Sequence, residues 1–272
     1  REKIPVQIFS SKVNKNNSLY SGKNNSLLKK IILNGNNNKC IILWSFTNIK
    51  NIHQFQLSIE GMMNILQLIK ANPNNEYIYL SSTSADLKYN YLSLYGLSKF
   101  LHEQYFLKYI NNQENIKLKI VRVGLIYGMQ NCPIKKIIRL RDFGIKLILG
   151  DEKSNFSVIS ALDLANNLIN ENSFLWKNEF QIAYLGEITR MSIKKIHLLY
   201  DKVNKKNFFF KIVILKKSFL YKFLHLIGFK LDLSLSEIDR FPSNEKLLKY
   251  HQILSIENYI NKIKMITSTK KR

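Results

Sequence analysis

The sequence has few cysteines, prolines and glycines. It contains 2 cysteines, Cys40 and Cys132, with 4 prolines and 10 glycines among its 272 residues. Two cysteines exclude a disulfide framework, and their spacing is not that of a zinc site. We therefore expect two reduced thiols, no metal, and a cytoplasmic protein held together by a hydrophobic core.

Long apolar runs are missing as well. No stretch reaches the roughly 18 consecutive apolar residues that a spanning helix needs, and the start of the chain has no signal-peptide pattern. We expect no membrane-spanning helix. The first residue is Arg1 rather than methionine, so we expect a fragment or a trimmed chain.

Acidic residues are scarce, with 19 Asp and Glu against 42 Lys and Arg, which gives a formal net charge of +23. Such a charge favours polyanionic partners, either nucleic acid or an anionic membrane. However, the lysines are scattered along the chain beside many Asn and Ile residues, and these types share A/T-rich codons. No RNA- or DNA-reading motif accompanies them. We therefore keep nucleic-acid binding only as an alternative and do not expect it.

Residues 77–101 carry the most specific chemistry in the chain. A short apolar run, 77–80, predicts a buried strand that ends in the hydroxyls of Ser81, Ser82 and Thr83. The following helix carries Tyr95 and Lys99, and a spacing of four places both on one helical face. A cation one turn away lowers the pKa of a phenol, so that the tyrosine can exchange a proton with a substrate oxygen. Alone, such a pair is more often an edge-of-core tyrosine beside a solvated lysine.

The residues after this helix make the pattern more specific, because 118–128 read as a strand followed by a glycine-containing turn. The hydroxyl-ended strand, Tyr-Gly-x-Ser-Lys and Val-Arg-x-Gly-x-x-Tyr-Gly together resemble the short-chain dehydrogenase/reductase superfamily, in its extended nucleotide-sugar epimerase/dehydratase branch. The similarity runs from about residue 5 to the C-terminus. It implies an α/β fold with a Rossmann-like, mostly parallel sheet flanked by helices and a smaller C-terminal substrate-binding lobe. We expect the core in 1–130 and the lobe in 131–272, with 156–186 returning to the core.

The resemblance implies NAD(P)-dependent chemistry on a nucleotide sugar, by epimerisation, dehydration or ketone reduction. In that case Tyr95 exchanges the proton, and Lys99 lowers its pKa and binds the nicotinamide ribose. Either Ser82 or Thr83 binds the sugar hydroxyl. The loop between these hydroxyls and Tyr95 is shorter than usual for the branch, which resembles an atypical subgroup associated with surface-polysaccharide synthesis.

Further cofactor contacts are implied at Ser45, which ends the predicted strand 39–45, at Ser81, and at Val123 beside the turn. Lys12 follows the predicted strand 4–10, where a cation favours the 2′-phosphate of NADP over NAD. A solvated lysine is the alternative for Lys12. The choice between NAD and NADP stays open.

One expected motif is absent. A dinucleotide fold of this type opens with a strand and a Gly-x-x-Gly-x-x-Gly turn that brings the pyrophosphate to a helix N-terminus, and the chain has no such turn. Trp44 and Phe46, which flank Ser45, are large for a position close to the cofactor. The missing turn indicates either an N-terminally incomplete core or the loss of cofactor binding. Together these features favour a second hypothesis, a non-catalytic scaffold or truncated relic that keeps the fold.

The second half of the chain offers further candidates. Arg139 and Arg141 lie on a predicted basic helix within 133–150 and suit a diphosphate, although a solvated basic face is favoured for both. Asp163 is predicted in the first turn of a helix, a structural position that the helix dipole favours. Ser192 is predicted to cap a helix over 193–203, and 180–186 to form a strand.

The stretch 208–229 is rich in aromatic residues and lysine. It suits an amphipathic helix on an anionic membrane, but the resemblance favours a strand and a helix that covers the sugar pocket. Residues 234–262 are predicted to form two short helices.

The helix predicted over 94–109 carries apolar residues on more than one face. These residues are Leu97, Phe100, Leu101, Tyr105, Phe106 and Leu107. The resemblance implies that this helix pairs with its copy in a homodimer. We expect a dimer in analytical ultracentrifugation at micromolar concentration, and a monomer there would contradict the prediction.

Overall fold

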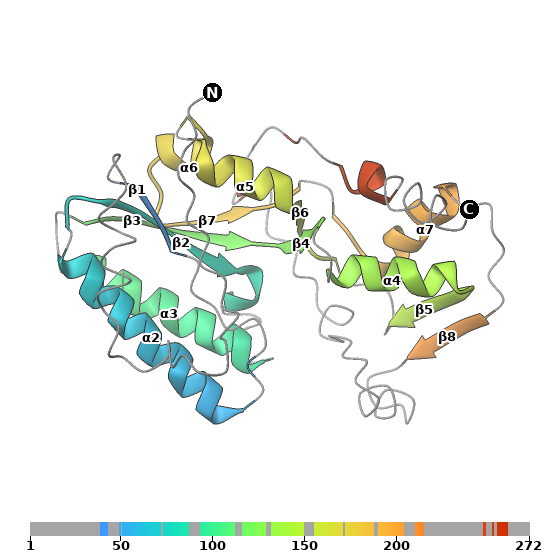
Figure 1. Ribbon diagram of the computed structural model, residues 1–272, viewed down its shortest axis with the longest axis horizontal. Helices are drawn as coiled ribbons and strands as arrows, with labels where there is room; N and C mark the ends of the chain where they lie inside the picture. The colour runs from blue at the N-terminus through green and yellow to red at the C-terminus, as the bar shows by residue number, and fades with distance from the viewer. Residues whose placement is uncertain are drawn as a thin grey trace, which may run out of the picture. The chain divides into compact units, whose positions relative to one another are not determined.

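A computed structural model describes a large part of the chain, drawn in Figure 1. It divides into two compact units, Arg1–Ile120 and Val121–Arg272. The described residues are 39–42, 49, 51–71, 73–86, 93–111, 116–128, 132–149, 155–170, 172–187, 190–203, 210–214, 247–248, 252 and 255–260. The predicted strand 4–10, Trp44, Phe46 and most of 208–229 lie outside them.

In the first unit, helices cover one face of a sheet. Strand β1 (Lys39–Ile42) pairs in parallel with β2 (Glu76–Ser82), so that Cys40 is opposite Tyr77. Strand β3 (Lys117–Val123) follows β2 in the sheet order and contributes its first residues to this unit. Figure 1 shows α2 (Ile52–Ala71) and α3 (Leu94–Asn111) on the same face of β1 and β2.

Polar side chains fix where both helices begin. The side chain of Asn51 accepts a hydrogen bond from the backbone N–H of Gln54 at the start of α2, with an N–O distance of 2.9 Å. Ser93 does the same for Gly96 at 3.0 Å, and its carbonyl accepts from Leu97. These bonds satisfy N–H groups that a helix cannot satisfy internally. They start α3 directly before Tyr95.

The core of the first unit joins the two helices to β2. Met62 and Ile69 of α2, Phe106 of α3, and Tyr77 and Tyr79 of β2 have no exposed surface. The rings of Tyr79 and Phe106 are 4.7 Å apart between centroids. Burying each large apolar side chain contributes on the order of 2 kcal/mol. This packing holds the face of α3 that carries Lys99 against β2.

The second unit contains shorter strands in parallel pairs. Strand β4 (Leu125–Tyr127) pairs with β6 (Val158–Ser160), β5 (Ile145–Leu149) with β8 (Phe210–Ile214), and β7 (Ile182–Leu185) with β9 (Leu247–Leu248). In the sheet order, β7 lies next to the end of β3. The helices of this unit include α4 (Pro133–Asp142), α5 (Ala161–Ile169), α6 (Phe174–Lys177) and α7 (Ile193–Val203), and residues 256–260 are helical too.

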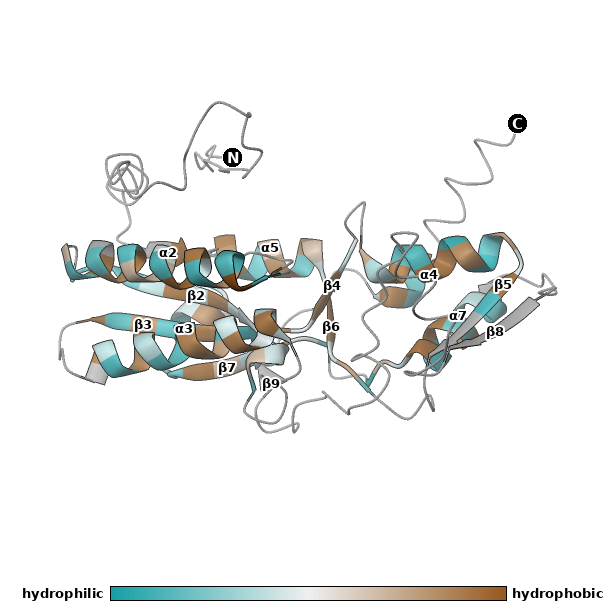
Figure 2. Cartoon of the chain, turned by 90° about the horizontal axis from the view of Figure 1, so that it is seen from below, coloured by the Kyte–Doolittle hydropathy of each residue, from teal (hydrophilic) through white to brown (hydrophobic). Residues whose placement is uncertain are grey.

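A hydrophobic core holds the second unit together. Figure 2 shows hydrophobic and hydrophilic residues interleaved along α4, and its Ile134, Ile137 and Ile138 are buried in that core. Cys132 accepts a hydrogen bond at its thiol from the N–H of Lys135 at the start of α4. This thiol is also 3.3 Å from the hydroxyl of Tyr259. Cys132 is a free, buried thiol, as the sequence predicts.

Two glycines permit a close approach of three chain segments. Gly124 follows β3 and Gly186 follows β7, and both lie against Ser157, which precedes β6. A Cβ atom at Gly124 would be 2.4 Å from the carbonyl oxygen of Ser157, and one at Gly186 would be 1.8 Å from its Oγ. Both distances are far below van der Waals contact. We call this contact the glycine junction.

The predictions for helix starts in the second unit are confirmed. The hydroxyl of Ser160 donates to Asp163 Oδ2 at 2.6 Å and accepts from the Asp163 N–H at 2.9 Å. Asp163 is fully buried in the first turn of α5, which gives it a structural role. Ser192 accepts from the N–H of Lys195 at the start of α7.

Two predictions are corrected. Arg141 is 3% exposed and forms an ion pair with Asp201, so it does not belong to a solvated basic face. Its guanidinium lies 5.2 Å from the centre of the Tyr200 ring, and both partners come from α7, which the sequence alone does not place against α4. Arg139 is exposed, as predicted. Within 234–262, where two helices were predicted, residues 256–260 are helical as predicted. Residues 247–248 instead form strand β9, because they pair with β7.

The glycine junction yields a prediction of stability. Gly186→Ala is expected to lower the free energy of unfolding by about 1 to 3 kcal/mol, because the new methyl group overlaps the Ser157 hydroxyl. Adding Ser157→Ala should restore most of the loss. The same second substitution should not rescue Gly124→Ala, where the obstacle is a main-chain carbonyl. Denaturant unfolding of the four variants measures this, and rescue of Gly124→Ala by Ser157→Ala would contradict it.

Candidate active site

One face of α3 carries the residues that the sequence singles out. Tyr95, Lys99, His102 and Glu103 recur at the spacing of successive helical turns, which places them on the same side. Tyr95 lies in the first turn of α3 and is half-buried. The other three are buried, with exposed fractions of 2% for Lys99 and 0% for His102 and Glu103. This face lies against β2.

The ammonium group of Lys99 is held at the end of β2. It donates a hydrogen bond of 2.8 Å to the carbonyl oxygen of Leu80 and one of 3.1 Å to the hydroxyl of Tyr79. The same Nζ atom lies 4.7 Å from the centre of the Tyr79 ring. The predicted alternative of a solvated lysine is therefore wrong, because Lys99 is buried and bound to the strand that carries the hydroxyls.

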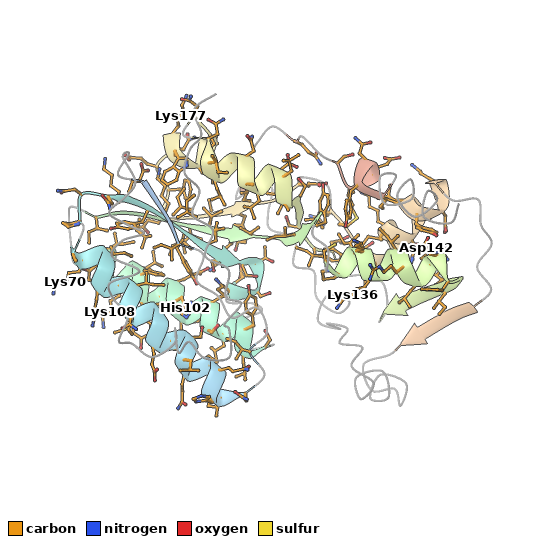
Figure 3. All side chains as sticks on the ribbon, in the orientation of Figure 1. Lys70, His102, Lys108, Lys136, Asp142 and Lys177 are labelled. Carbon is orange, nitrogen blue, oxygen red and sulfur yellow. The ribbon has the colours of Figure 1, made fainter. Side chains whose placement is uncertain are left out.

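Tyr79 also connects Lys99 to the second helix. Its hydroxyl is 2.8 Å from Nδ1 of His102. The other ring nitrogen, Nε2, is 3.1 Å from the carbonyl oxygen of Ser58 and 3.3 Å from its Oγ. Ser58 belongs to α2, so His102 of α3, which is labelled in Figure 3, contacts both α2 and β2.

The carboxylate of Glu103 binds the first hydroxyl after the apolar part of β2. Ser81 Oγ donates to Glu103 Oε1 at 2.5 Å, and both residues are buried. Tyr79 and Ser81 are two residues apart in the strand, so their side chains point to the same face. The proton of the Ser81 hydroxyl is therefore used inside the protein, and its cofactor contact stays a prediction.

Burial shifts the protonation of this cluster. It lowers the pKa of Lys99 to about 7, against the attraction of Glu103, which raises it. Burial, assisted by the charge of Lys99, lowers the pKa of His102 to about 3. The pKa of Tyr79 is raised well above its usual value by burial, then by the charges of Tyr95 and Glu103. His102 is thus neutral near pH 7, and Lys99 titrates there.

The two candidate substrate hydroxyls belong to the last residue of β2, Ser82, and to the residue after it, Thr83. Ser82 and Thr83 are half-buried, in contrast to Ser81. Residues Thr83–Ala85 form the 3-10 turn η1, and Ser82 Oγ accepts from the N–H of Ser84 at 3.2 Å. Both hydroxyls thus come at the end of the strand whose Leu80 carbonyl binds Lys99.

The cofactor contacts of the other predicted residues stay predictions. Val123 is the last residue of β3 and is 5% exposed. Ser45 and Lys12 lie outside the described residues. The described residues contain no group of three or more side chains suited to a metal ion. None of the described helices is long and apolar enough to span a membrane.

Sequence reasoning missed Tyr79, His102 and Glu103. Helical periodicity contained the signal for the last two, because they lie seven and eight residues after Tyr95 on the same face. Strand alternation likewise places Tyr79 with Ser81. It also missed Glu187, whose carboxylate accepts a hydrogen bond from Tyr127 in the second unit. Burial raises the pKa of Glu187.

Among the comparisons with known proteins, the one with solved structures finds similar folds. No protein-family model matches the chain, and no curated protein matches its sequence. A UDP-N-acetylglucosamine 4-epimerase from Methanobrevibacter ruminantium, solved with UDP-N-acetylmuramic acid, aligns with a TM-score of 0.65 at 16% identity. It covers 89% of this chain and 80% of its own. The chain shares the fold of that solved structure.

Two further solved structures extend the likeness. A dTDP-glucose 4,6-dehydratase from Bacillus anthracis in complex with NAD has a TM-score of 0.64 at 13% identity, over 91% of this chain and 78% of that one. A UDP-Glc/GlcNAc 4-epimerase from Campylobacter jejuni has a TM-score of 0.62 at 13% identity, over 91% and 82%. The predicted α/β fold with a parallel sheet flanked by helices is thereby confirmed.

The buried lysine predicts a pH dependence of stability. The pKa of Lys99 is about 7 in the folded protein and 10.5 for a free lysine, so between these values the unfolded state holds the proton more tightly. This contribution to the unfolding free energy therefore rises with pH in that window, by up to about 1.4 kcal/mol per pH unit. Below about pH 7 the cost of burying the charge is fully present.

Denaturant unfolding at about pH 7 and pH 9 measures this contribution. Lys99→Met should remove most of the rise that the unmodified chain shows between the two values. Lys108→Met, at an exposed position on the same helix, is the matched control and should keep it. Equal slopes in both variants would contradict the assignment.

Proposed function

We propose that this chain carries out NAD(P)-dependent chemistry on a nucleotide sugar, of the epimerase or dehydratase type. The observation that carries the proposal is the buried Lys99, fixed on β2 one helical turn after Tyr95. A buried cation at this distance is the feature that makes a tyrosine a useful acid or base near pH 7. The fold shared with epimerases and a dehydratase supports the same conclusion.

The described residues fit the nicotinamide-ribose end of the cofactor. Ribose offers hydroxyl groups, which need charged or polar partners, and Lys99 and Tyr95 lie at the end of a parallel strand, where such ligands bind in open α/β sheets. For the pyrophosphate end, the sequence offers no glycine-rich turn. The similar dehydratase was solved with NAD, which supports NAD, while Lys12 is the residue that would favour NADP.

When bound, the nicotinamide ring supplies hydride acceptance and return. The chain's own residues handle the protons. Tyr95 takes the proton from a sugar hydroxyl and later returns it. Lys99 favours the charged phenolate form of Tyr95 by electrostatic attraction. Ser82 or Thr83 holds the sugar oxygen so that it points at the phenol, and the half-buried position of both hydroxyls supports either role.

We extend the proposal to the substrate class and the assembly. Nucleotide sugars are the substrates named for the similar epimerases. The short loop before Tyr95 resembles that of an atypical subgroup associated with surface-polysaccharide synthesis, and we propose that role for this chain. The homodimer through α3 remains part of the proposal. Tyr105 on this helix is 41% exposed, as a surface that pairs with a second copy requires.

A second candidate is a non-catalytic scaffold with the same fold. The observation that favours it is the absence of a Gly-x-x-Gly-x-x-Gly turn from the whole sequence. Without that turn the pyrophosphate loses its backbone N–H partners. Cofactor titration separates the candidates, since a scaffold of this kind binds neither NAD(H) nor NADP(H).

The proposed chemistry predicts the effect of Tyr95→Phe. This change should lower kcat on a UDP-sugar by about a thousandfold or more, because it removes the acid-base group. The dissociation constant for NAD(H) should stay within about threefold, since only one hydroxyl is lost. Calorimetric titration and a coupled epimerase assay measure the two quantities.

Tyr109 lies near the C-terminal end of the same helix and is partly buried. Tyr109→Phe is the matched control and should leave both quantities unchanged. Ser82→Ala and Thr83→Val identify the substrate hydroxyl, and the larger rise in KM marks it. Full turnover in Tyr95→Phe, or no cofactor binding by the unmodified chain, would refute the proposed function.

A further inference from the structure

The hydrogen bonds around His102 have a fixed direction. The carbonyl oxygen of Ser58 can only accept, and it lies 3.1 Å from Nε2 of His102, so this nitrogen carries the ring proton. A neutral imidazole has one donor and one acceptor nitrogen. Nδ1 must therefore accept, and the group 2.8 Å from it is the hydroxyl of Tyr79.

The direction continues through Tyr79 to Lys99. Because the phenol gives its one proton to His102, its oxygen presents lone pairs to its other neighbour, the ammonium of Lys99 at 3.1 Å. In the reverse arrangement Nε2 would accept from Ser58 Oγ over 3.3 Å, but its lone pair would also face the nearer Ser58 carbonyl oxygen at 3.1 Å, which is repulsive. Ser58, Tyr79 and His102 are at most 1% exposed, so the protein interior imposes this order without competition from solvent.

From this geometry we propose that Tyr79 and His102 are positioning residues for Lys99. They hold its ammonium group in place and favour its charged form for the acid-base step at Tyr95. The assignment rests on the proposed function, because it explains how Lys99 is held in place and kept charged for the acid-base step at Tyr95. Tyr79 accepts from Lys99, His102 orients Tyr79, and the main chain of α2 orients His102.

The geometry distinguishes this role from proton conduction. A proton passed inward from Lys99 would have to form a charged imidazole at His102, where burial opposes it and the lysine charge repels it. The series of hydrogen bonds from Lys99 through Tyr79 and His102 also ends at the main-chain carbonyl of Ser58, which cannot take up a proton. Leu80 supplies the second acceptor for Lys99, at 2.8 Å. Two fixed acceptors thus restrain a side chain that is otherwise among the most flexible.

Other charged groups around Lys99 have to be separated from this effect. Glu103 on α3 attracts the ammonium, and Tyr95 lies close enough for its charge to affect Tyr79. Tyr79→Phe removes the acceptor and leaves Glu103 and Tyr95 in place. Tyr77→Phe is the matched control, because Tyr77 is equally buried on the same face of the same strand.

The test is an NMR titration of the chain without cofactor. Lysine labelled with ¹³C at Cε reports the Lys99 pKa, and its signal is identified by its loss in Lys99→Met. We expect Tyr79→Phe to lower this pKa by about one unit, and Tyr77→Phe to leave it unchanged. An unchanged pKa in Tyr79→Phe would overturn the proposal.

The imidazole gives a second readout that needs no change to Tyr79. Nitrogen-15 spectra of the unmodified chain should show His102 neutral and protonated at Nε2, with its signal identified by loss in His102→Leu. His102→Asn keeps an acceptor for the Tyr79 hydroxyl and should preserve the Lys99 pKa better than His102→Leu does. Protonation at Nδ1, or equal effects of the two variants, would overturn the proposal even if Tyr79→Phe failed to fold.

The pH dependence of kcat then tests whether this positioning of Lys99 affects catalysis. With a UDP-sugar, the alkaline limb of the kcat profile should move down by about one pH unit in Tyr79→Phe, with KM unchanged. Displacement of KM instead of the pH limb would contradict a positioning role. Because the NMR readouts need no cofactor, they test the positioning of Lys99 even if the chain proves unable to bind NAD and the proposed function fails.

Discussion

The burial of one ammonium group shapes the described part of the first unit. A lysine loses much solvation when it is 2% exposed, and the cost is several kcal/mol unless polar groups replace the water. The end of β2 supplies them through a main-chain carbonyl and a tyrosine hydroxyl, and Glu103 supplies charge. For these groups to meet Lys99, α3 must lie against β2 in one rotation and one register. The apolar contacts around Phe106 and Met62 provide that docking.

Much of this arrangement was predictable from local patterns. Helix and strand periodicity predict β2, α3 and β3 closely, because each has an apolar face or a buried run bounded by turn or capping residues. The pairing of Tyr95 with Lys99 on one face follows from the spacing alone. The partner of the lysine does not, because Tyr79 is one of 14 tyrosines and only the docking of α3 on β2 selects it.

The second unit shows where sequence patterns were insufficient. Arg141 reads as one of several basic residues on an exposed helix face, yet it is buried against α7 by Asp201 and Tyr200. Strand β9 has two residues, too few for any periodic signal, and exists through its pairing with β7. Both errors concern partners that are distant in the chain. The cap at Ser192 and the first-turn position of Asp163 were predicted correctly because their hydrogen-bond partners are three residues away.

The thiol of Cys132 has a use beyond its place at the start of α4. It is 2% exposed and contacts Tyr259, which lies 127 residues later in the sequence. A thiol reagent can reach it only when this part of the hydrophobic core opens. In a chain with Cys40 replaced by serine, the rate at which Cys132 is labelled would therefore report the opening free energy of the second unit by itself. The stability of one unit can thus be measured at a native thiol, with no introduced cysteine.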